Sequence, residues 1–127
     1  MVHAVFKNFE QVTSRDLSGM SETEFDGLHF GAIRLDRHGT VKAYNRWEAA
    51  LARRDKDMVL GKNFFTDVAP CTDVAAFRGR LDRLALSGDT SYVFDFDFSF
   101  PWGKRRVRVR FLVESNDDRW VFVTDVT

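Results

Sequence analysis

The sequence predicts one α+β domain in which an antiparallel sheet of five strands carries helices on one face. Two observations lead to this class. Strand-like segments lie on both sides of a helical stretch, and those after it alternate apolar with polar residues. Five strands cannot bury both faces of a sheet unaided, so helices must cover one of them. The 127 residues, of which 44% are apolar and 13 are Phe, suffice for one core.

The N-terminal third of the chain predicts a short helix and a hairpin. Ser21 and Glu24 have the spacing of a capping box, in which two side chains satisfy backbone N–H groups at the start of a helix. Residues 30–35 and 41–44 are predicted strands. The segment between them ends in Gly39, which predicts the turn that joins the two strands.

The middle of the chain predicts helices. A helical stretch begins near Asn45, and residues 72–86 form the clearest helix, which Thr72 or Asp73 would cap. Gly88 follows this helix as a stop signal. Four apolar residues are spaced to fall on one face of it: Val74, Phe77, Leu81 and Leu84.

Three further strands complete the predicted sheet. Residues 92–100 and 106–113 have a period of two, with one apolar face each. A polar turn over residues 115–118 then leads to a final strand at 120–124. The predicted order is therefore two strands, a helical middle and three strands.

Composition argues against several classes of function. The 19 basic and 19 acidic residues balance, so the chain lacks the electrostatic footprint of a protein that binds nucleic acid or anionic membranes. No apolar run approaches the roughly 18 residues of a membrane span, and the N-terminus lacks signal-peptide blocks. One cysteine cannot form an internal disulfide, so we expect a cytoplasmic protein. Neither a phosphate-binding loop nor metal-ligand spacing is present, and we expect no metal site and no enzyme.

A ladder of three arginines could still indicate nucleic-acid binding: Arg106, Arg108 and Arg110. We favour a structural interpretation. Asp95 and Asp97 lie on the polar face of the preceding strand, where they can pair with the ladder across the hairpin.

Cys71 is the single thiol of the chain. A lone cysteine is most often a small buried apolar residue. Its position after Pro70 and just before the predicted helix also allows a nucleophile or an acyl acceptor, because N–H groups at a helix start favour a thiolate.

Tyr44 and Glu48 are four residues apart and could share a face of a helical turn. Simpler interpretations exist for both. Glu48 could close a capping box with Asn45, and Tyr44 could be an aromatic residue at the edge of the core with a wet hydroxyl. The residues by themselves leave these alternatives open.

A long motif, GKNFFTDVAPCTD, stands at residues 61–73. Shorter ones are Asp26-Gly27-Leu28, Phe30-Gly31-Ala32-Ile33, Leu35-Asp36, Tyr44-Asn45, Glu48, Arg54, Ser87-Gly88 and Trp120-Val121-Phe122-Val123. In order and spacing these motifs resemble the photoactive yellow protein family, and the order of elements resembles the PAS sensor fold. The similarity is weak in residues 1–25, which we interpret as an N-terminal cap segment. We interpret residues 26–127 as the photosensory region of one structural domain.

The resemblance implies a bacterial blue-light photoreceptor that carries p-coumaric acid as a thioester on Cys71. It implies that Tyr44 and Glu48 hydrogen-bond the phenolate of this chromophore and that Arg54 shields the pocket. In the implied photocycle, light isomerises the chromophore, Glu48 gives up its proton, and partial unfolding is the signal. The implied pocket lining is Ile33, Ala52, Phe64, Val68, Ala69, Pro70, Thr72, Phe98 and Trp102.

The resemblance also implies sensory transduction to an unidentified signalling protein, without nucleic acid or membrane, by a monomer or weak dimer. Two other functions remain open: a PAS sensor that binds a diffusible small ligand, and a protein-interaction module. A colourless purified protein would favour either of them.

Two positions depart from the family pattern. Ala52 stands where the best-known members carry Thr, whose hydroxyl supports the tyrosine. Trp102 falls where they carry Met, a residue linked to thermal resetting. Both changes affect the expected colour and recovery rate, and leave the attachment chemistry intact.

Overall fold

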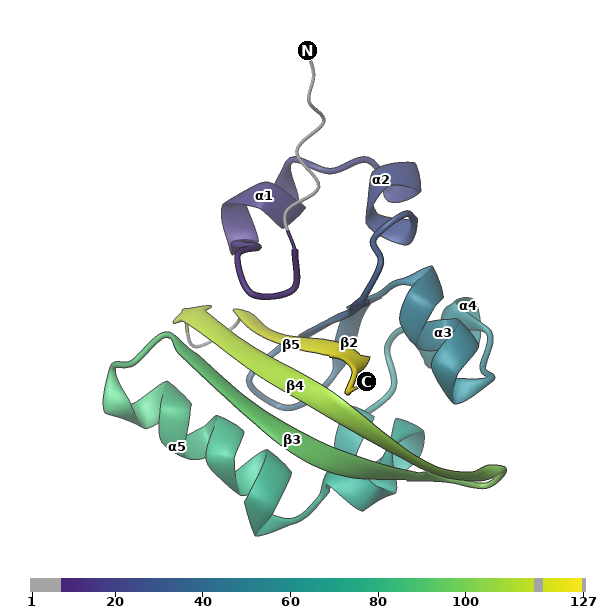
Figure 1. The fold of residues 1–127 in the computed structure, drawn as a ribbon. Coiled ribbons are helices and arrows are strands. Elements are labelled where there is room, and N and C mark those ends of the chain that lie inside the picture. Colours follow the sequence, from purple (N-terminus) through teal and green to yellow (C-terminus); the bar gives the residue numbers. More distant parts are fainter. Residues whose placement is uncertain (1–7, 116–117, 127) are drawn as a thin grey trace.

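Five antiparallel strands form one sheet. The computed structural model describes residues 8–115 and 118–126 (Figure 1). The strands are β1 (Gly31–Leu35), β2 (Val41–Tyr44), β3 (Ser91–Phe100), β4 (Gly103–Ser115) and β5 (Asp118–Asp125). They lie in the order β2-β1-β5-β4-β3, and every neighbouring pair is antiparallel. The predicted class and the predicted order of elements along the chain are confirmed, while residues 116–117 of the predicted turn lie outside the described residues.

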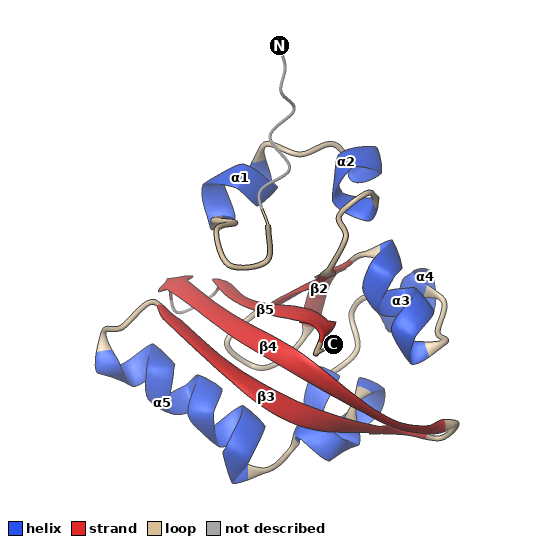
Figure 2. Cartoon of the chain, viewed as in Figure 1, coloured by secondary structure: helices blue, strands red, loops and turns tan. Residues whose placement is uncertain are grey.

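Short helices surround the sheet (Figure 2). They are α1 (Ser14–Ser18), α2 (Glu22–Asp26), α3 (Arg46–Ala52), α4 (Lys56–Val59) and α5 (Arg80–Ser87). Three helical turns lie between α4 and α5, namely η1 (Phe64–Val68), η2 (Pro70–Thr72) and η3 (Ala75–Gly79). The predicted capping box at the start of α2 is present, with Ser21 and Glu24 bonded reciprocally.

The predicted start of the helix at residue 72 is wrong. Val74 is extended, with φ −140° and ψ 162°, and the helical backbone begins only at Ala75. Val74 therefore leaves the apolar face and is 45% exposed, whereas Phe77 and Leu81 are buried. Neither Thr72 nor Asp73 caps this helix. Its end agrees with the prediction, because Gly88 has φ +85°, a value that glycine adopts at little cost.

Two apolar clusters lie on opposite faces of the sheet, since neighbouring residues of a strand point to opposite sides. Ile33 belongs to the larger cluster with residues of α3, α4 and α5, whereas Ala32 belongs to the smaller one. The smaller cluster joins residues of the N-terminal segment, such as Val12, to Phe122 of β5 and to Phe30, which directly precedes β1. Figure 1 shows α1 and α2 on the side of the sheet away from α5. The predicted N-terminal cap thus covers the second face, while its boundary at residue 25 stays a prediction.

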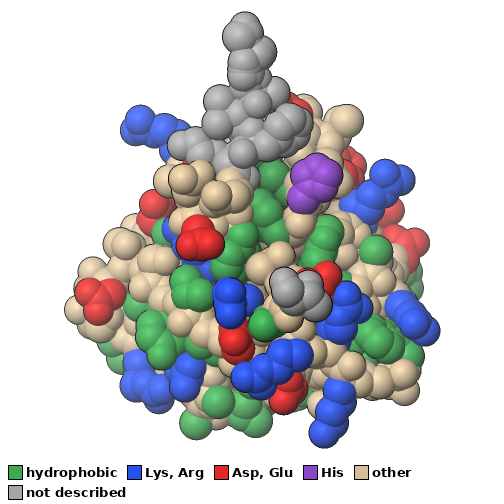
Figure 3. Space-filling view, viewed as in Figure 1, with side chains coloured by type: hydrophobic (Ala, Val, Ile, Leu, Met, Phe, Trp, Pro, Cys, Tyr) green, Lys and Arg blue, Asp and Glu red, His purple; other side chains and the backbone are tan. Residues whose placement is uncertain are grey.

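The arginine ladder divides between two environments. Arg108 and Arg106 pair with Asp95 and Asp97 across the hairpin at 2.8 and 3.1 Å, as predicted. Arg110 differs, because the N-terminal segment covers it and leaves it 8% exposed. Basic and acidic side chains intermingle on the face of the molecule that Figure 3 presents. That surface gives no single-signed patch for a polyanion.

Candidate functional site

Asn45 fixes the start of α3 and with it the position of Glu48. Its Oδ1 accepts the backbone N–H groups of Glu48 at 3.3 Å and of Ala32 at 3.0 Å. The N–H of Asn45 itself donates to the carbonyl of Ala32. The capping-box interpretation of Glu48 is therefore wrong, because the N–H that its carboxyl would accept is bonded to β1.

The Glu48 carboxyl is buried beside β1. The residue is 2% exposed, and burial raises the pKa of its carboxyl from 4.5 to about 8. A Cβ at Gly31 would collide with Glu48 Oε1, so glycine at this position lets the carboxyl approach the strand. Oε1 has no hydrogen-bond partner among the described residues. The site thus contains a neutral carboxyl group with spare hydrogen-bonding capacity.

Tyr44 lies beside Glu48 at the end of β2. It is 3% exposed, and burial raises the pKa of its phenol, with the nearby Glu48 as a second cause. Arg54 acts on the same phenol in the opposite direction. The structure therefore brings Tyr44, Glu48 and Arg54 within electrostatic reach of one another, and Tyr44 stays protonated at neutral pH.

Cys71 occupies the middle of η2. Its Sγ is partly buried and accepts the backbone N–H of Ser99 on β3 at 3.4 Å. The turn is fixed by Thr72, whose hydroxyl and N–H both donate to the carbonyl of Ala69, at 2.7 and 2.9 Å. Because η2 is a separate three-residue turn, the expected effect of a following helix dipole on the thiol does not apply.

Most of the predicted lining residues meet at the larger apolar cluster. Ile33, Tyr44, Phe64, Val68 and Phe98 belong to it, and Ala69 and Cys71 pack against it. Ala52 is 8% exposed in the last turn of α3, and Thr72 is buried. Pro70 is exposed at the first position of η2.

Two arginines that directly follow α3 contact η1 and the turn between β3 and β4. Arg54 is exposed, and its Nη1 donates to the carbonyls of Val68 at 3.0 Å and Asp67 at 3.4 Å. Arg53, which the sequence did not single out, holds its guanidinium 4.4 Å from the ring centre of Trp102. Trp102 in turn stacks flat on Phe100, with 4.9 Å between the ring centres.

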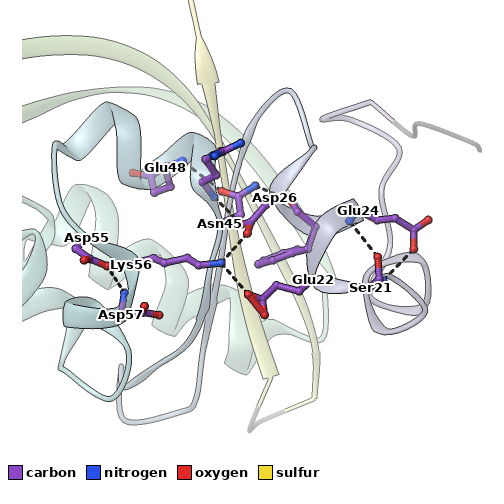
Figure 4. Close-up of polar contacts among 11 residues, drawn as sticks. Ser21, Glu22, Glu24, Asp26, Asn45, Glu48, Asp55, Lys56 and Asp57 are labelled. Carbon is purple, nitrogen blue, oxygen red and sulfur yellow. Dashed lines mark hydrogen bonds and ion pairs between the residues drawn. The ribbon is translucent and has the colours of Figure 1, made fainter.

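Polar contacts connect the helix of Glu48 to the N-terminal segment (Figure 4). Asp26 at the end of α2 accepts the N–H of Arg46 at 2.9 Å and pairs with Lys56 of α4 at 2.6 Å. Asn45 Nδ2 donates to the carbonyls of Phe25 and Phe30. These contacts join residues 15 to 30 positions apart, which no short-range motif could indicate.

This arrangement suits an apolar group that needs hydrogen-bond donors at one end and a covalent bond at the other. For such a group, the carboxyl of Glu48 and the phenol of Tyr44 would be the donors, and the Cys71 thiol would be the attachment point. No cluster of three or more potential metal ligands exists within residues 8–115 and 118–126. No helix in those ranges combines the length and apolar character that crossing a membrane requires.

Comparison with known proteins places this geometry in a family. A family model of the PAS fold matches residues 25–127. The photoactive yellow protein of Rhodothalassium salexigens is 39% identical over 111 residues, which are 87% of this chain and 89% of that protein. This chain belongs to the photoactive yellow protein family. The family member from Halochromatium salexigens is also 39% identical, over 84% of this chain and 86% of its own.

A solved structure agrees with the assignment to the photoactive yellow protein family. It is the photoactive yellow protein domain of the sensor histidine kinase Ppr from Rhodospirillum centenum. The two structures superpose with a TM-score of 0.83 at 40% identity, over 89% of this chain and all of that domain. The chain is therefore a photosensory PAS domain of the photoactive yellow protein type.

Proposed function

We propose that this chain is a blue-light photoreceptor that carries p-coumaric acid as a thioester on Cys71. The observation that carries the proposal is the buried Glu48 carboxyl beside the buried phenol of Tyr44, because Oε1 of Glu48 has no partner among residues 8–115 and 118–126. A phenolate placed between these two groups would receive the donors it needs. Burial of a phenolate without them would cost several kcal/mol.

Attachment requires only a thiol and an activated acid. The Cys71 sulfur forms a bond to the acyl carbon, the bond from that carbon to the activating group breaks, and the thiol proton leaves with the activating group. Cys71 is accessible enough for this step, because its side chain is partly exposed. Arg54, two residues after α3, contacts η1 through the carbonyl of Val68. From this position it would cover the phenolate end of the bound group.

The bound group would supply absorption of blue light and isomerisation about its double bond. After that isomerisation, Glu48 would transfer its proton to the phenolate oxygen and become a carboxylate. An ionised Glu48 would then be a buried, unpaired carboxylate, which is unstable in a low dielectric. Hydrogen bonds between the start of α3 and the end of α2 connect the helix of Glu48 to the N-terminal segment. Local opening of the N-terminal segment would expose the carboxylate to water, and this opening would be the signal.

The expected partner is a signalling protein. One structural relative is a domain of a sensor histidine kinase, which supports a role as a sensory input for a regulator of that kind. We expect the chain to act by changing shape and without catalysing a reaction, as a cytoplasmic monomer or weak dimer.

Chromophore attachment is tested by incubating the protein with the anhydride of p-coumaric acid. The wild type should become yellow, gain one p-coumaroyl group by intact mass, and lose it in hydroxylamine, which cleaves thioesters. Cys71→Ser should remain colourless and unlabelled. Labelling of the Ser variant would contradict the proposal. Colour that dialysis removes would also contradict it and would favour a sensor of diffusible ligands. Absence of any uptake would favour an interaction module.

Ala52→Thr should change the dark spectrum of the loaded protein. A supporting hydroxyl contributes roughly 0.5–1.5 kcal/mol, or about one pKa unit of the bound phenol. Because Ala52 lacks it, the wild type should show a second dark band at shorter wavelength that grows as pH falls. The Thr variant should reduce this band in a pH titration followed by absorbance. A single blue band down to mildly acidic pH would show that Tyr44 and Glu48 hold the anion without help from position 52.

A further inference from the structure

The ring of Trp102 contacts both Phe100 and Arg53. Its ring stacks on Phe100 at the end of β3, with 8° between the ring planes. Arg53, directly after the last residue of α3, covers it at 4.4 Å. The hairpin tip is thereby attached to the end of the helix that carries Glu48 and Ala52.

The indole N–H of Trp102 is buried and has no acceptor in the part of the chain that the structure describes. Within residues 8–115 and 118–126, four buried side-chain polar atoms lack a partner, and two of them are Trp102 Nε1 and Glu48 Oε1. An unsatisfied buried donor costs about 1–3 kcal/mol, so such groups are rare unless something binds them. Glu48 lies on α3, and Trp102 lies in the turn between β3 and β4.

Trp102 lies on the same side of the sheet as the chromophore site. Phe96, Phe98 and Phe100 pack against one another along β3, and Trp102 continues this row. The row faces the larger apolar cluster, and the N–H of Ser99, beside Phe98, contacts Cys71 Sγ. Trp102, with its unpaired indole N–H, is therefore one of the side chains that would surround a group bonded to Cys71.

We propose that Trp102 is a chromophore-binding residue whose indole N–H donates a hydrogen bond to the phenolate oxygen of the bound p-coumaroyl group. The phenolate is favoured over the thioester oxygen because Trp102 contacts the end of α3, whereas Cys71 lies on η2. Ala52 provides no hydroxyl to support the phenolate network. Trp102, in the turn between β3 and β4, would add a hydrogen-bond donor in its place. This inference rests on the proposed function of the site.

The test compares free and loaded protein labelled with ¹⁵N. The three tryptophans give three indole N–H signals, and Trp102→Phe identifies one of them by its loss. On loading, the Trp102 signal should move downfield much further than those of Trp47 and Trp120. In loaded Trp102→Phe, the pKa of the bound phenol should rise by about one unit or more, a tenfold change in its proton affinity.

Arg53→Lys is the matched control, since it removes the planar group over Trp102 but keeps the charge and the N–H. It should shift the phenol pKa less than Trp102→Phe does. If the wild type loads but its Trp102 signal stays in place and Trp102→Phe titrates like the wild type, this inference is overturned while the proposed function stands. If the wild type fails to load, the proposed function fails and this inference fails with it.

Discussion

Glu48→Gln should abolish a pH dependence of stability that the wild-type chain shows without chromophore. The folded pKa of Glu48 is about 8, against 4.5 when the carboxyl is solvated. Between these values the folded state binds a proton that the unfolded state has lost. This stabilisation is complete below about pH 4.5 and is lost as pH rises through about 8, at about 1.4 kcal/mol per pH unit. Gln cannot ionise, so its curve should lack this slope.

The comparison requires urea unfolding of both proteins at several pH values. Glu10→Gln removes an exposed carboxyl and should keep the slope of the wild type. Parallel curves for the wild type and Glu48→Gln would show that Glu48 is ionised in the folded chain. In the loaded protein, the same substitution should keep the yellow colour, shift the band, and remove the carboxylic-acid signal from light-minus-dark infrared spectra.

Arg110→Met should detach the N-terminal segment from the sheet. Arg110 Nη1 donates to the carbonyls of Val12 at 2.8 Å and Phe9 at 3.2 Å, and Nε donates to Ser91 Oγ at 3.1 Å. The guanidinium also covers the ring of Phe122. Hydrogen bonds from a charged donor contribute about 1.5–3 kcal/mol each. Burial of the guanidinium offsets much of that sum, so loss of these three bonds should lower stability by roughly 2–3 kcal/mol.

Amide hydrogen exchange locates this effect. Residues 9–20 should lose protection in Arg110→Met, whereas β1 and β5 should keep theirs. Arg110→Lys preserves the charge but lacks the planar fork, so it should restore the protection only in part. Unchanged protection of residues 9–20 in the Met variant would show that apolar contacts alone hold the segment.

The sequence predicted those features that short-range patterns determine. Alternation along β3 and β4 is a property of each strand, and Asn45 caps α3 through a residue three positions away. The start of the helix at Ala75 was missed because apolar spacing continues back to Val74, where the backbone is already extended. Periodicity records which positions could share a face, and it does not record where the backbone leaves the helix.

The environment of Arg110 could not be predicted for a different reason. Its alternation with Val109 and Phe111 places it on the solvent side of β4. A segment 98 to 101 positions earlier covers that side. Gly31 and Glu48 are likewise 17 positions apart, and their contact needs the fold of β1 against α3. Family resemblance supplied the candidate site residues, while the physical reason for the neutral carboxyl came from burial in the structure.

The contact of Gly31 with the Glu48 carboxyl restricts how this site can vary among relatives. A side chain at position 31 would occupy the volume of Oε1 and also approach Trp47. We therefore expect substitutions at positions 31 and 48 to vary together, since a larger residue at position 31 would force the carboxyl of Glu48 to shift away from β1. Under the proposed function, a relative without this glycine should hold its proton donor in a different position, and the residue at position 31 then indicates which sequences keep the carboxyl against β1.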